Sequence, residues 1–261
     1  MKKITVPVIL GPTAVGKTDL VLEVAEALGY EVVSCDSRQI YRYMDVGTAK
    51  PSPQERARVP HWLIDILDPS EPYSAFAFAD DALRVIRSLG EKGKKTLICG
   101  GAGLYYHILV NGTAPLSGPD SVPVREERSP PEDIEFRTVV LNRPRDVLYR
   151  RINRRVDAML SQGLWDEFLA LRGMGYAEAS PGMICLGYRE LFAVERGEVE
   201  LPRAIELIKQ NTRHYAKRQL TWFRNKIDAE WIDINDEENG AGALNGWLEK
   251  EKLANLHNNM V

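Results

Sequence analysis

The sequence is poor in cysteine and histidine, the residues that build zinc sites and disulfide scaffolds. Its three cysteines are far apart along 261 residues, and the four histidines do not have the spacing of a zinc site. Disulfide-stapled folds instead place many cysteines within a short chain. We therefore interpret Cys35, Cys99 and Cys185 as small core residues of a protein in a reducing compartment.

Long apolar runs are also missing. No run approaches the ~18 consecutive residues that a membrane-spanning helix needs. The first residues, Met1 to Lys3, lead directly into a strand-like stretch and lack the pattern of a signal peptide. We expect a cytoplasmic protein that makes no membrane contact, and we expect it to be a monomer.

The chain lacks a strong net charge, since its formal charge is −3. Its charges are nevertheless unevenly placed. Residues 143–155 contain six arginines and one acid, residues 203–226 contain seven lysines or arginines and one acid, and residues 228–251 are mainly acidic. A protein that binds nucleic acid by charge alone is basic overall. The basic blocks therefore indicate local anion-binding surfaces, or else solvated helix faces.

The most informative stretch is a glycine-rich turn near the start of the chain. It reads Gly11-Pro12-Thr13-Ala14-Val15-Gly16-Lys17-Thr18, between a strand-like run at residues 4–10 and a helical run at 19–28. This spacing at a strand-to-helix turn is typical of a phosphate loop. The glycines let the backbone approach an anion, Lys17 adds a charge, and the Thr18 hydroxyl is placed to hold a magnesium ion. The motif predicts a bound phosphate or pyrophosphate without identifying the compound.

The alternation of predicted strands and helices indicates a single α/β domain over residues 1–261. We expect a P-loop NTPase-like, mostly parallel sheet flanked by helices, with a helical C-terminal part. The predicted strands lie at residues 4–10, 31–35, 61–66, 94–99, 135–141 and 230–234, and the main helices at 19–28, 53–59, 74–89, 104–110, 143–156, 165–171, 187–196, from 202 onward and near the C-terminus. Residues 112–133 are rich in proline and glycine and have the composition of a linker.

Asp36 follows the second predicted strand. Parallel strands joined by a crossover helix end at the same edge of the sheet, so Asp36 should lie beside the phosphate loop. A carboxylate there is placed for chemistry, and its alternative role is to cap a short helix that runs to Tyr41. Gly100, Gly101 and Gly103 end a later strand at this edge, where they either let a ligand approach the backbone or form a tight turn.

An ordered series of motifs resembles the tRNA dimethylallyltransferase family, also called tRNA isopentenyltransferases or IPP transferases. The series covers the chain from its start to about Arg224. It consists of the phosphate loop, Asp36-Ser37-x-Gln39-x-Tyr41, Gly47-Thr48-Ala49-Lys50-Pro51, Leu63-Ile64-Asp65 with Asp68-Pro69, Tyr73-Ser74, Gly100-Gly101-x-Gly103-Leu104-Tyr105, Leu186-Gly187-Tyr188 and Thr212-Arg213-x-Tyr215-Ala216-Lys217-Arg218-Gln219-x-Thr221-Trp222-Phe223. Together these motifs are far more specific than the phosphate loop alone.

The resemblance implies that a dimethylallyl group passes from dimethylallyl diphosphate to N6 of the adenosine next to the tRNA anticodon, with release of diphosphate. Members of the family use the phosphate loop to hold the pyrophosphate of the prenyl donor rather than ATP. By this resemblance Lys17, Thr18 with Mg²⁺, and Arg213 would stabilise the departing pyrophosphate. Asp36 would be the general base that takes a proton from the amine.

The same resemblance implies that the tRNA anticodon stem-loop presents a flipped adenosine to the cleft. The residues expected to contact tRNA are Asp36, Ser37, Arg38, Gln39, Ala102 and Arg125. Two features depart from the family pattern. Ala102 stands where the glycine turn usually carries threonine, and the helical tRNA-binding subdomain expected after Asn111 is missing, with residues 112–133 in its place. Without that subdomain we expect weaker and less selective tRNA binding.

Three other functions are compatible with these residues. A phosphate loop with an arginine-rich helix also serves kinases of nucleotides or small molecules. Loss of the tRNA-binding subdomain would favour prenylation of free AMP or ADP. A non-enzymatic RNA-binding module would keep its affinity when Asp36 is replaced and would lose it steeply with added salt.

Overall fold

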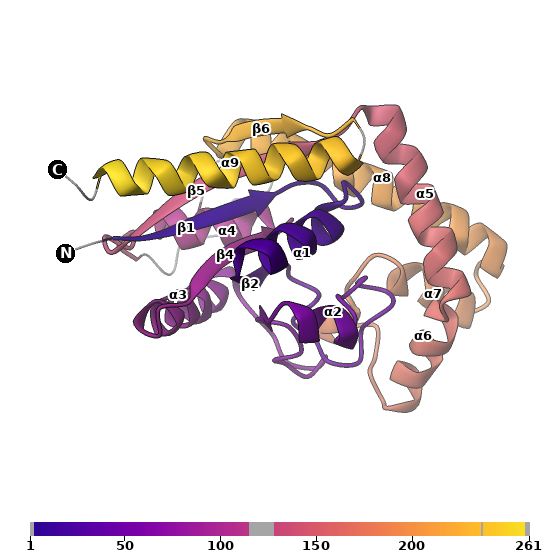
Figure 1. Cartoon of the computed structure of the whole chain (residues 1–261). Coiled ribbons are helices and arrows are strands. Elements are labelled where there is room, and N and C mark those ends of the chain that lie inside the picture. The colour runs from indigo at the N-terminus through magenta and orange to yellow at the C-terminus, as the bar shows by residue number, and fades with distance from the viewer. Residues whose placement is uncertain (1–2, 115–127, 236, 259–261) are drawn as a thin grey trace.

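A computed structural model describes residues 3–114, 128–235 and 237–258 of the chain. These residues form the strands β1 (Ile4–Leu10), β2 (Tyr30–Cys35), β3 (His61–Trp62), β4 (Lys95–Gly100), β5 (Ile134–Asn142) and β6 (Glu230–Asp233). The strands form one sheet in the order β3-β2-β4-β1-β5-β6, and all neighbours pair in parallel (Figure 1). The predicted parallel α/β fold is confirmed.

Both faces of the sheet are buried, because residues of β1 alternate between two hydrophobic cores. Val8 and Leu10 face α3 (Ala75–Glu91) and α4 (Gly103–Asn111), whereas Ile9 faces α1 (Lys17–Leu28) and α9 (Glu237–Asn258). In Figure 1, α9 lies along α1 and β1 on one side of the molecule. A sheet covered on both faces leaves its strand ends as the place for a ligand.

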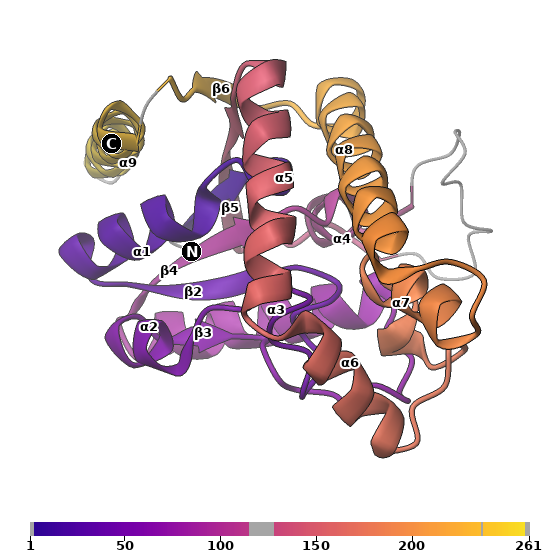
Figure 2. The same ribbon diagram turned by 90° about the vertical axis from the view of Figure 1, so that its right-hand side faces the viewer.

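Four helices gather beyond the carboxyl ends of the strands, where Figure 2 shows α5 and α8 side by side in front of the sheet. They are α5 (Arg145–Ser161), α6 (Leu164–Gly173), α7 (Tyr188–Glu195) and α8 (Leu201–Lys226). Their own core contains Phe168 and Tyr188 together with Ile40, Tyr41 and Met44 from the segment after β2. The helical part predicted for the C-terminal half is confirmed, and it packs on the segment that follows Asp36.

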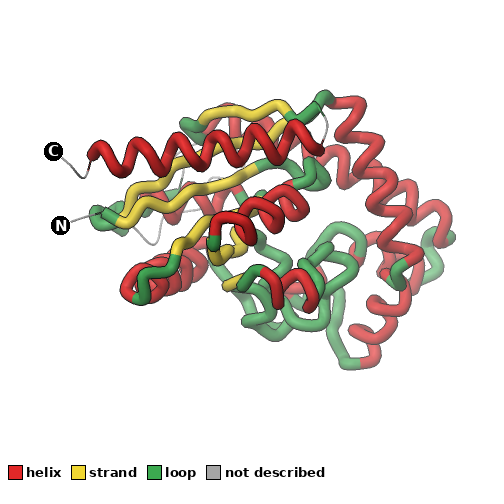
Figure 3. Tube along the Cα trace, in the orientation of Figure 1, coloured by secondary structure: helices red, strands yellow, loops and turns green. Residues whose placement is uncertain are grey.

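The segment between β2 and α3 is mostly loop (Figure 3) and contains α2 (Pro53–Arg58). Ser52 caps α2, because its Oγ accepts the N–H of Glu55 at 3.2 Å and the Glu55 carboxylate accepts the N–H of Ser52 at 2.7 Å. The predicted start of a helix at Ser74 is also confirmed, since Ser74 Oγ accepts the N–H of Ala77 at 3.0 Å ahead of α3. The other predicted helices are present with small shifts at their ends.

The strand predicted at residues 61–66 was wrong beyond its first two residues. β3 ends at Trp62, and both Leu63 and Asp65 have left-handed backbone, with φ values of 62° and 57°. The Asp65 carboxylate accepts hydrogen bonds from Lys50 Nζ at 2.5 Å and from Arg56 Nη1 at 2.6 Å. These tertiary ion pairs outweigh the local alternation of apolar residues, so the chain turns instead of extending.

Of the predicted linker at 112–133, residues 115–127 lie outside the described residues. Among the helices of the described ranges, none combines the length and the apolar character that crossing a bilayer requires. Of the three cysteines, Cys35 and Cys185 are buried and Cys99 is half-buried, and all three are free thiols.

Candidate active site

The predicted strand-to-helix turn at residues 11–18 is confirmed between β1 and α1. Left-handed backbone at Ala14 (φ 62°) and Gly16 (φ 103°) bends the chain, and Val15 N–H donates to the Pro12 carbonyl at 3.3 Å. The first amides of α1 have no acceptor within the helix, and the helix dipole places positive potential at its start. The turn therefore has the form of an anion-binding nest.

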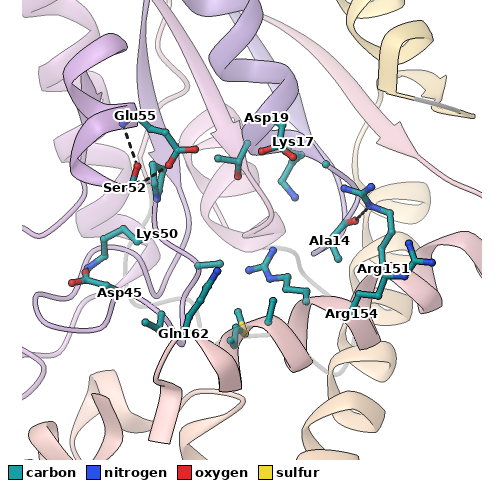
Figure 4. A pocket seen from close by; sticks show the side chains of 18 of the residues that line it. Ala14, Lys17, Asp19, Asp45, Lys50, Ser52, Glu55, Arg151, Arg154 and Gln162 are labelled. Carbon is teal, nitrogen blue, oxygen red and sulfur yellow. Dashed lines mark hydrogen bonds and ion pairs between the residues drawn. The ribbon is translucent and has the colours of Figure 1, made fainter. Parts of the chain in front are cut away.

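Two arginines from the β5–α5 region donate to the carbonyls of this loop. Arg143 Nε lies 2.7 Å from the Val15 oxygen, and Arg151 Nε lies 3.0 Å from the Ala14 oxygen (Figure 4). Arg143 is only 4 % exposed. The guanidinium groups take up these two carbonyls, so the carbonyls do not face a bound anion, and the first amides of α1 are the backbone donors for a ligand.

Lys17 crosses the mouth of the loop. Its Nζ donates to the carbonyls of Gly11 and Pro12, both at 2.8 Å. Burial lowers the pKa of Lys17 from its usual 10.5 to about 8, with a smaller opposing effect of the Cys99 thiol and a further lowering by Arg155. The ammonium is thus held where a bound anion would relieve the cost of its burial.

Asp36 follows β2 directly, at the same edge of the sheet as the phosphate loop. Its Oδ1 accepts the backbone N–H of Arg38 at 2.8 Å and that of Gln39 at 3.3 Å. These bonds close a turn at residues 37–40, in place of the short helix considered as the alternative. The turn orients the carboxylate through one oxygen and leaves Oδ2 for a substrate.

The glycine turn after β4 is a tight turn braced by α8. The N–H groups of Gly101 and Ala102 both donate to the Cys35 carbonyl at 3.2 Å. Gln219 of α8 then joins this turn to the phosphate loop, because its Nε2 donates to the Gly101 carbonyl and its Oε1 accepts the Thr13 N–H, both at 2.9 Å. A Cβ on Gly101 would lie 2.5 Å from Gln219 Nε2, so a larger residue there would displace the Gln219 amide from its two hydrogen bonds.

These elements meet around a cavity of ≈ 90 Å³. It is lined by the phosphate loop, the end of β2, the glycine turn and the helices α5 and α8: Thr13, Lys17, Thr18, Ser34, Asp36, Gln39, Ala49, Cys99, Gly100, Gly101, Arg155, Tyr215 and Gln219. Two larger cavities share lining residues with it. One of ≈ 750 Å³, drawn in Figure 4, includes Lys17 and Thr18, and one of ≈ 360 Å³ includes Thr13 and Asp36.

Arg155 lines all three cavities and was not predicted as a site residue. Burial lowers the pKa of its guanidinium, and the nearby Asp36 raises it. A signal for this residue exists in the sequence. Leu148, Ile152 and Val156 mark the buried face of α5, and Arg155 stands directly beside that face. Arg155 is half-buried and adds a second cation to the lining of the small cavity.

The predicted Arg213 is placed differently. Its Nη1 donates to Asn153 Oδ1 of α5 at 2.6 Å, and it does not line the three cavities described above. Its assignment to the pyrophosphate stays a prediction.

Some of the residues expected to contact tRNA line the cavities, and others do not. Ser37 and Arg38 line the ≈ 360 Å³ cavity, and Arg38 Nη1 also donates to the Pro181 carbonyl at 3.0 Å. Ala102 is the residue before α4 and offers no side-chain cap. Arg125 lies outside the described residues. The described residues also hold no group of three His, Cys, Asp or Glu side chains suited to a metal ion.

Together these features define a P-loop α/β enzyme whose phosphate loop shares a small cavity with a carboxylate at the next strand end. Family models agree with this class. The model described as IPP transferase matches residues 39–129 and 116–226, and the model described as Isopentenyl transferase matches residues 4–65.

The chain is 38% identical to the tRNA dimethylallyltransferase of Thermotoga petrophila, over 96% of this chain and 97% of that protein. It is 41% identical to the tRNA dimethylallyltransferase of Syntrophobacter fumaroxidans, over 90% and 85% of the two chains. The crystal structure of the full-length tRNA isopentenylpyrophosphate transferase from Bacillus halodurans matches it with a TM-score of 0.85 at 31% identity, over 99% of this chain and 100% of that one. The chain belongs to the IPP transferase family.

Proposed function

We propose that the protein is a tRNA dimethylallyltransferase. It transfers the dimethylallyl group of dimethylallyl diphosphate to N6 of the adenosine adjacent to the tRNA anticodon, and it does so in the cytoplasm as a monomer. The observation that carries this proposal is the ≈ 90 Å³ cavity lined by both the phosphate loop and Asp36. Relatives named for this activity, 38% and 41% identical over most of the chain, support it.

On the donor side, the phosphate loop and Lys17 hold the diphosphate of the prenyl donor. The bond between the allylic carbon and the diphosphate oxygen breaks, so negative charge grows on the leaving group. Lys17 and Arg155, which line the same cavity, stabilise this charge. Arg213 is a further candidate for this role, although its guanidinium is bonded to Asn153.

A magnesium ion fits the donor groups at the loop. The Thr18 hydroxyl and the Asp36 carboxylate line the same small cavity, and oxygen donors of this kind suit Mg²⁺ when water and substrate phosphates complete its shell. When bound, the ion supplies charge neutralisation at the diphosphate. We propose Thr18 as the protein ligand.

On the acceptor side, Asp36 acts as general base. Its Oδ1 is held by the Arg38 and Gln39 amides, and its Oδ2 accepts a proton from N6 as the new carbon–nitrogen bond forms. An adenine amine is a weak nucleophile, so alignment with the allylic carbon matters as much as basicity. Ser37 and Arg38, which line the ≈ 360 Å³ cavity, contact the flipped base or its neighbours.

The shortened segment after Asn111 alters tRNA binding in this proposal. The alignment with the Thermotoga petrophila relative spans 305 positions, more than the 261 residues of this chain, so that relative carries residues without a counterpart here. We propose that the missing residues are the tRNA-binding subdomain. Weaker and less selective tRNA binding then follows, and Ala102 adds to it because it lacks the hydroxyl of threonine.

The test is direct. The protein is incubated with dimethylallyl diphosphate, Mg²⁺ and unmodified tRNA, the tRNA is digested, and prenylated adenosine is measured by mass spectrometry. Parallel reactions contain free AMP or ADP, or ATP without a prenyl donor. We expect product on tRNA, and we expect Asp36→Asn to slow its formation by about 100- to 10,000-fold, the range for loss of a general base.

Asp146→Asn is the control, because this exposed carboxylate pairs with Arg150 at the start of α5. ATP turnover without any prenylated adenosine would replace the proposal with a kinase. Product on free nucleotide but not on tRNA would change the acceptor, and full activity of Asp36→Asn would exclude Asp36 as the base.

A further inference from the structure

The loop at residues 45–50, called here the 45–50 loop, separates the two larger cavities of the cleft. Asp45, Val46, Ala49 and Lys50 line the ≈ 750 Å³ cavity, and Gly47 and Thr48 line the ≈ 360 Å³ cavity. Ala49 also lines the small cavity that holds Asp36. A movement of this loop would therefore change the shape of all three spaces at once.

One carboxylate of α6 holds the amides at the start of the 45–50 loop, whereas Lys50 at its end is held by the Tyr41 carbonyl and the Asp65 carboxylate. Glu167 Oε2 accepts the N–H groups of Asp45 and Val46, both at 2.7 Å, and its Oε1 accepts the N–H of Gly47 at 2.8 Å. The Tyr188 hydroxyl of α7 donates to the same Oε1 at 2.6 Å. Three successive amides and a phenol thus converge on one side chain, and charge-assisted bonds of this kind are stronger than neutral ones.

Close packing reinforces this arrangement. Tyr188 is fully buried, and burial, followed by the Glu167 carboxylate, raises its pKa well above the usual value, so its hydroxyl stays a donor. A Cβ on Gly47 would lie 2.4 Å from the Tyr188 hydroxyl oxygen. The loop therefore needs glycine at this position in order to reach Glu167.

The opposite side of the 45–50 loop is tied to the catalytic carboxylate. Gln39 Nε2 donates to the carbonyls of Thr48 at 3.4 Å and Ala49 at 3.2 Å, and Gln39 Oε1 accepts the Ser34 hydroxyl at 3.1 Å. The backbone N–H of Gln39 donates to Asp36 Oδ1 at 3.3 Å. A continuous series of hydrogen bonds therefore runs from α6 through the loop and Gln39 to Asp36.

We propose that Glu167 is a positioning residue for the acceptor reaction: it fixes the 45–50 loop, and the loop fixes Gln39 beside Asp36. Gln39 then acts through hydrogen bonds within the protein, because its side-chain oxygen already accepts the Ser34 hydroxyl and its NH₂ group already donates to the loop carbonyls. The kinetic part of this inference rests on the proposed prenyl transfer. The structural part, that Glu167 locks the loop amides, does not depend on the reaction.

The test replaces Glu167 with glutamine, which keeps the shape of the side chain. An amide has one acceptor oxygen, so its NH₂ group must face at least one of the donors that the carboxylate accepts. We expect kcat/KM for tRNA to fall about 10- to 100-fold, as for the loss of a hydrogen bond to a charged group, while the KM for dimethylallyl diphosphate changes by less than about threefold.

Asp166→Asn is the matched control, because Asp166 is the neighbouring, exposed carboxylate of α6. The unfolding midpoint in urea is measured for both variants. A Glu167→Gln variant with wild-type tRNA kinetics would overturn the proposal. Equal losses for tRNA and for the prenyl donor, together with a collapse of the unfolding midpoint, would also overturn it, because they indicate a general structural role.

Amide hydrogen exchange tests the structural part independently. In the wild type we expect slow exchange at residues 45–47, and in Glu167→Gln faster exchange there, with the phosphate loop at residues 11–18 unchanged. Equal exchange in the two proteins would contradict a lock by Glu167. If the exchange differs as expected but no acceptor is prenylated, the proposed function fails while the positioning role stands.

Discussion

The cleft is bordered by two loops that are held in opposite ways. The carbonyls of the phosphate loop accept hydrogen bonds from Arg143 and Arg151, whereas the amides of the 45–50 loop donate to Glu167. Cations thus hold one loop by its acceptors, and an anion holds the other by its donors. Arg151 and Glu167 stand on α5 and α6, and Arg143 lies in the connection between β5 and α5.

The two loops also differ in what they present to the cleft. The phosphate loop leads into the start of α1, where the first amides of the helix and the helix dipole suit the negative charge of a diphosphate. In the 45–50 loop, Gln39 Nε2 donates to the carbonyls of Thr48 and Ala49, and the N–H groups of Ala49 and Lys50 donate to those of Val46 and Asp45. The 45–50 loop is thus fixed by its own hydrogen bonds and by Glu167, and mutations on the two sides should have separable kinetic effects.

The largest loss of activity is expected when the charge of Lys17 at the phosphate loop is removed. Lys17→Ala should lower kcat about 100- to 1000-fold, since it deletes a preorganised group that stabilises the leaving diphosphate. The measurement is single-turnover prenyl transfer at saturating tRNA. Lys92→Ala is the control, because Lys92 is exposed at the end of α3. If Lys17→Ala loses no more activity than Glu167→Gln, the proposed difference between the two loops is wrong.

Removal of a support behind the phosphate loop should have a smaller effect. Arg151→Met deletes the donor to the Ala14 carbonyl. A hydrogen bond from a charged group contributes about 1.5–3 kcal/mol. Its loss should therefore raise the KM for dimethylallyl diphosphate roughly tenfold or more. The KM for tRNA should stay near the wild-type value.

The adjacent Arg150→Met provides the matched control for that measurement. Arg150 pairs with Asp146 at the surface of the same helix and does not line the three cavities. A rise in the tRNA KM for Arg151→Met, or an equal rise in the donor KM for both variants, would show that α5 does not act through the phosphate loop.

Local patterns in the sequence were sufficient to predict the phosphate loop and the position of Asp36 at the sheet edge. The loop is a contiguous stretch between a strand and a helix, and the crossover rule places Asp36 at the same sheet edge. The strand expected at 61–66 failed for the opposite reason, because ion pairs of Asp65 with Lys50 and Arg56 decide its backbone. Contacts of that kind leave no periodic trace in the chain.

The supports of the two loops could not be predicted because they act across long sequence separations. Gln219 reaches Thr13 over 206 positions, and Glu167 reaches Gly47 over 120. Arg155 could be recognised as one of several arginines, but only the packing of α5 shows that it enters the small cavity. The sequence thus predicted the groups proposed to contact the substrate better than the groups that hold them in place.

A rise of pH above about 8 should weaken the donor side through Lys17. Burial lowers the pKa of Lys17 to about 8, and only the protonated form stabilises the diphosphate. In the free enzyme kcat/KM for the prenyl donor should therefore fall about tenfold per pH unit above that value. The pH profile of the donor kcat/KM measures this, and a profile that stays flat to pH 10 would contradict it.

Folding stability should change in the opposite direction over the same range. The unfolded lysine keeps its proton up to about its usual 10.5, so between pH 8 and that value the unfolded state binds more protons than the folded state. The contribution of Lys17 to the free energy of unfolding then rises with pH while the activity falls. Urea unfolding of the wild type and of Lys17→Met at several pH values tests the sign, which a decline specific to the wild type would refute.

The smallest effect is expected from Tyr188→Phe on the acceptor side. This change removes one of the four hydrogen bonds that Glu167 accepts and keeps the three loop amides and the aromatic ring. A hydrogen bond to a charged group contributes about 1.5–3 kcal/mol, and we expect the low end because the carboxylate keeps its three amide donors. The change should therefore lower kcat/KM for tRNA roughly tenfold, less than Glu167→Gln does. Because the hydroxyl acts only through the Glu167 carboxylate, the two substitutions should not be additive, and the double variant should resemble Glu167→Gln alone. Additive losses in this cycle would mean that Tyr188 supports the 45–50 loop by its own packing against Gly47, and the carboxylate would then no longer account for how the loop is held.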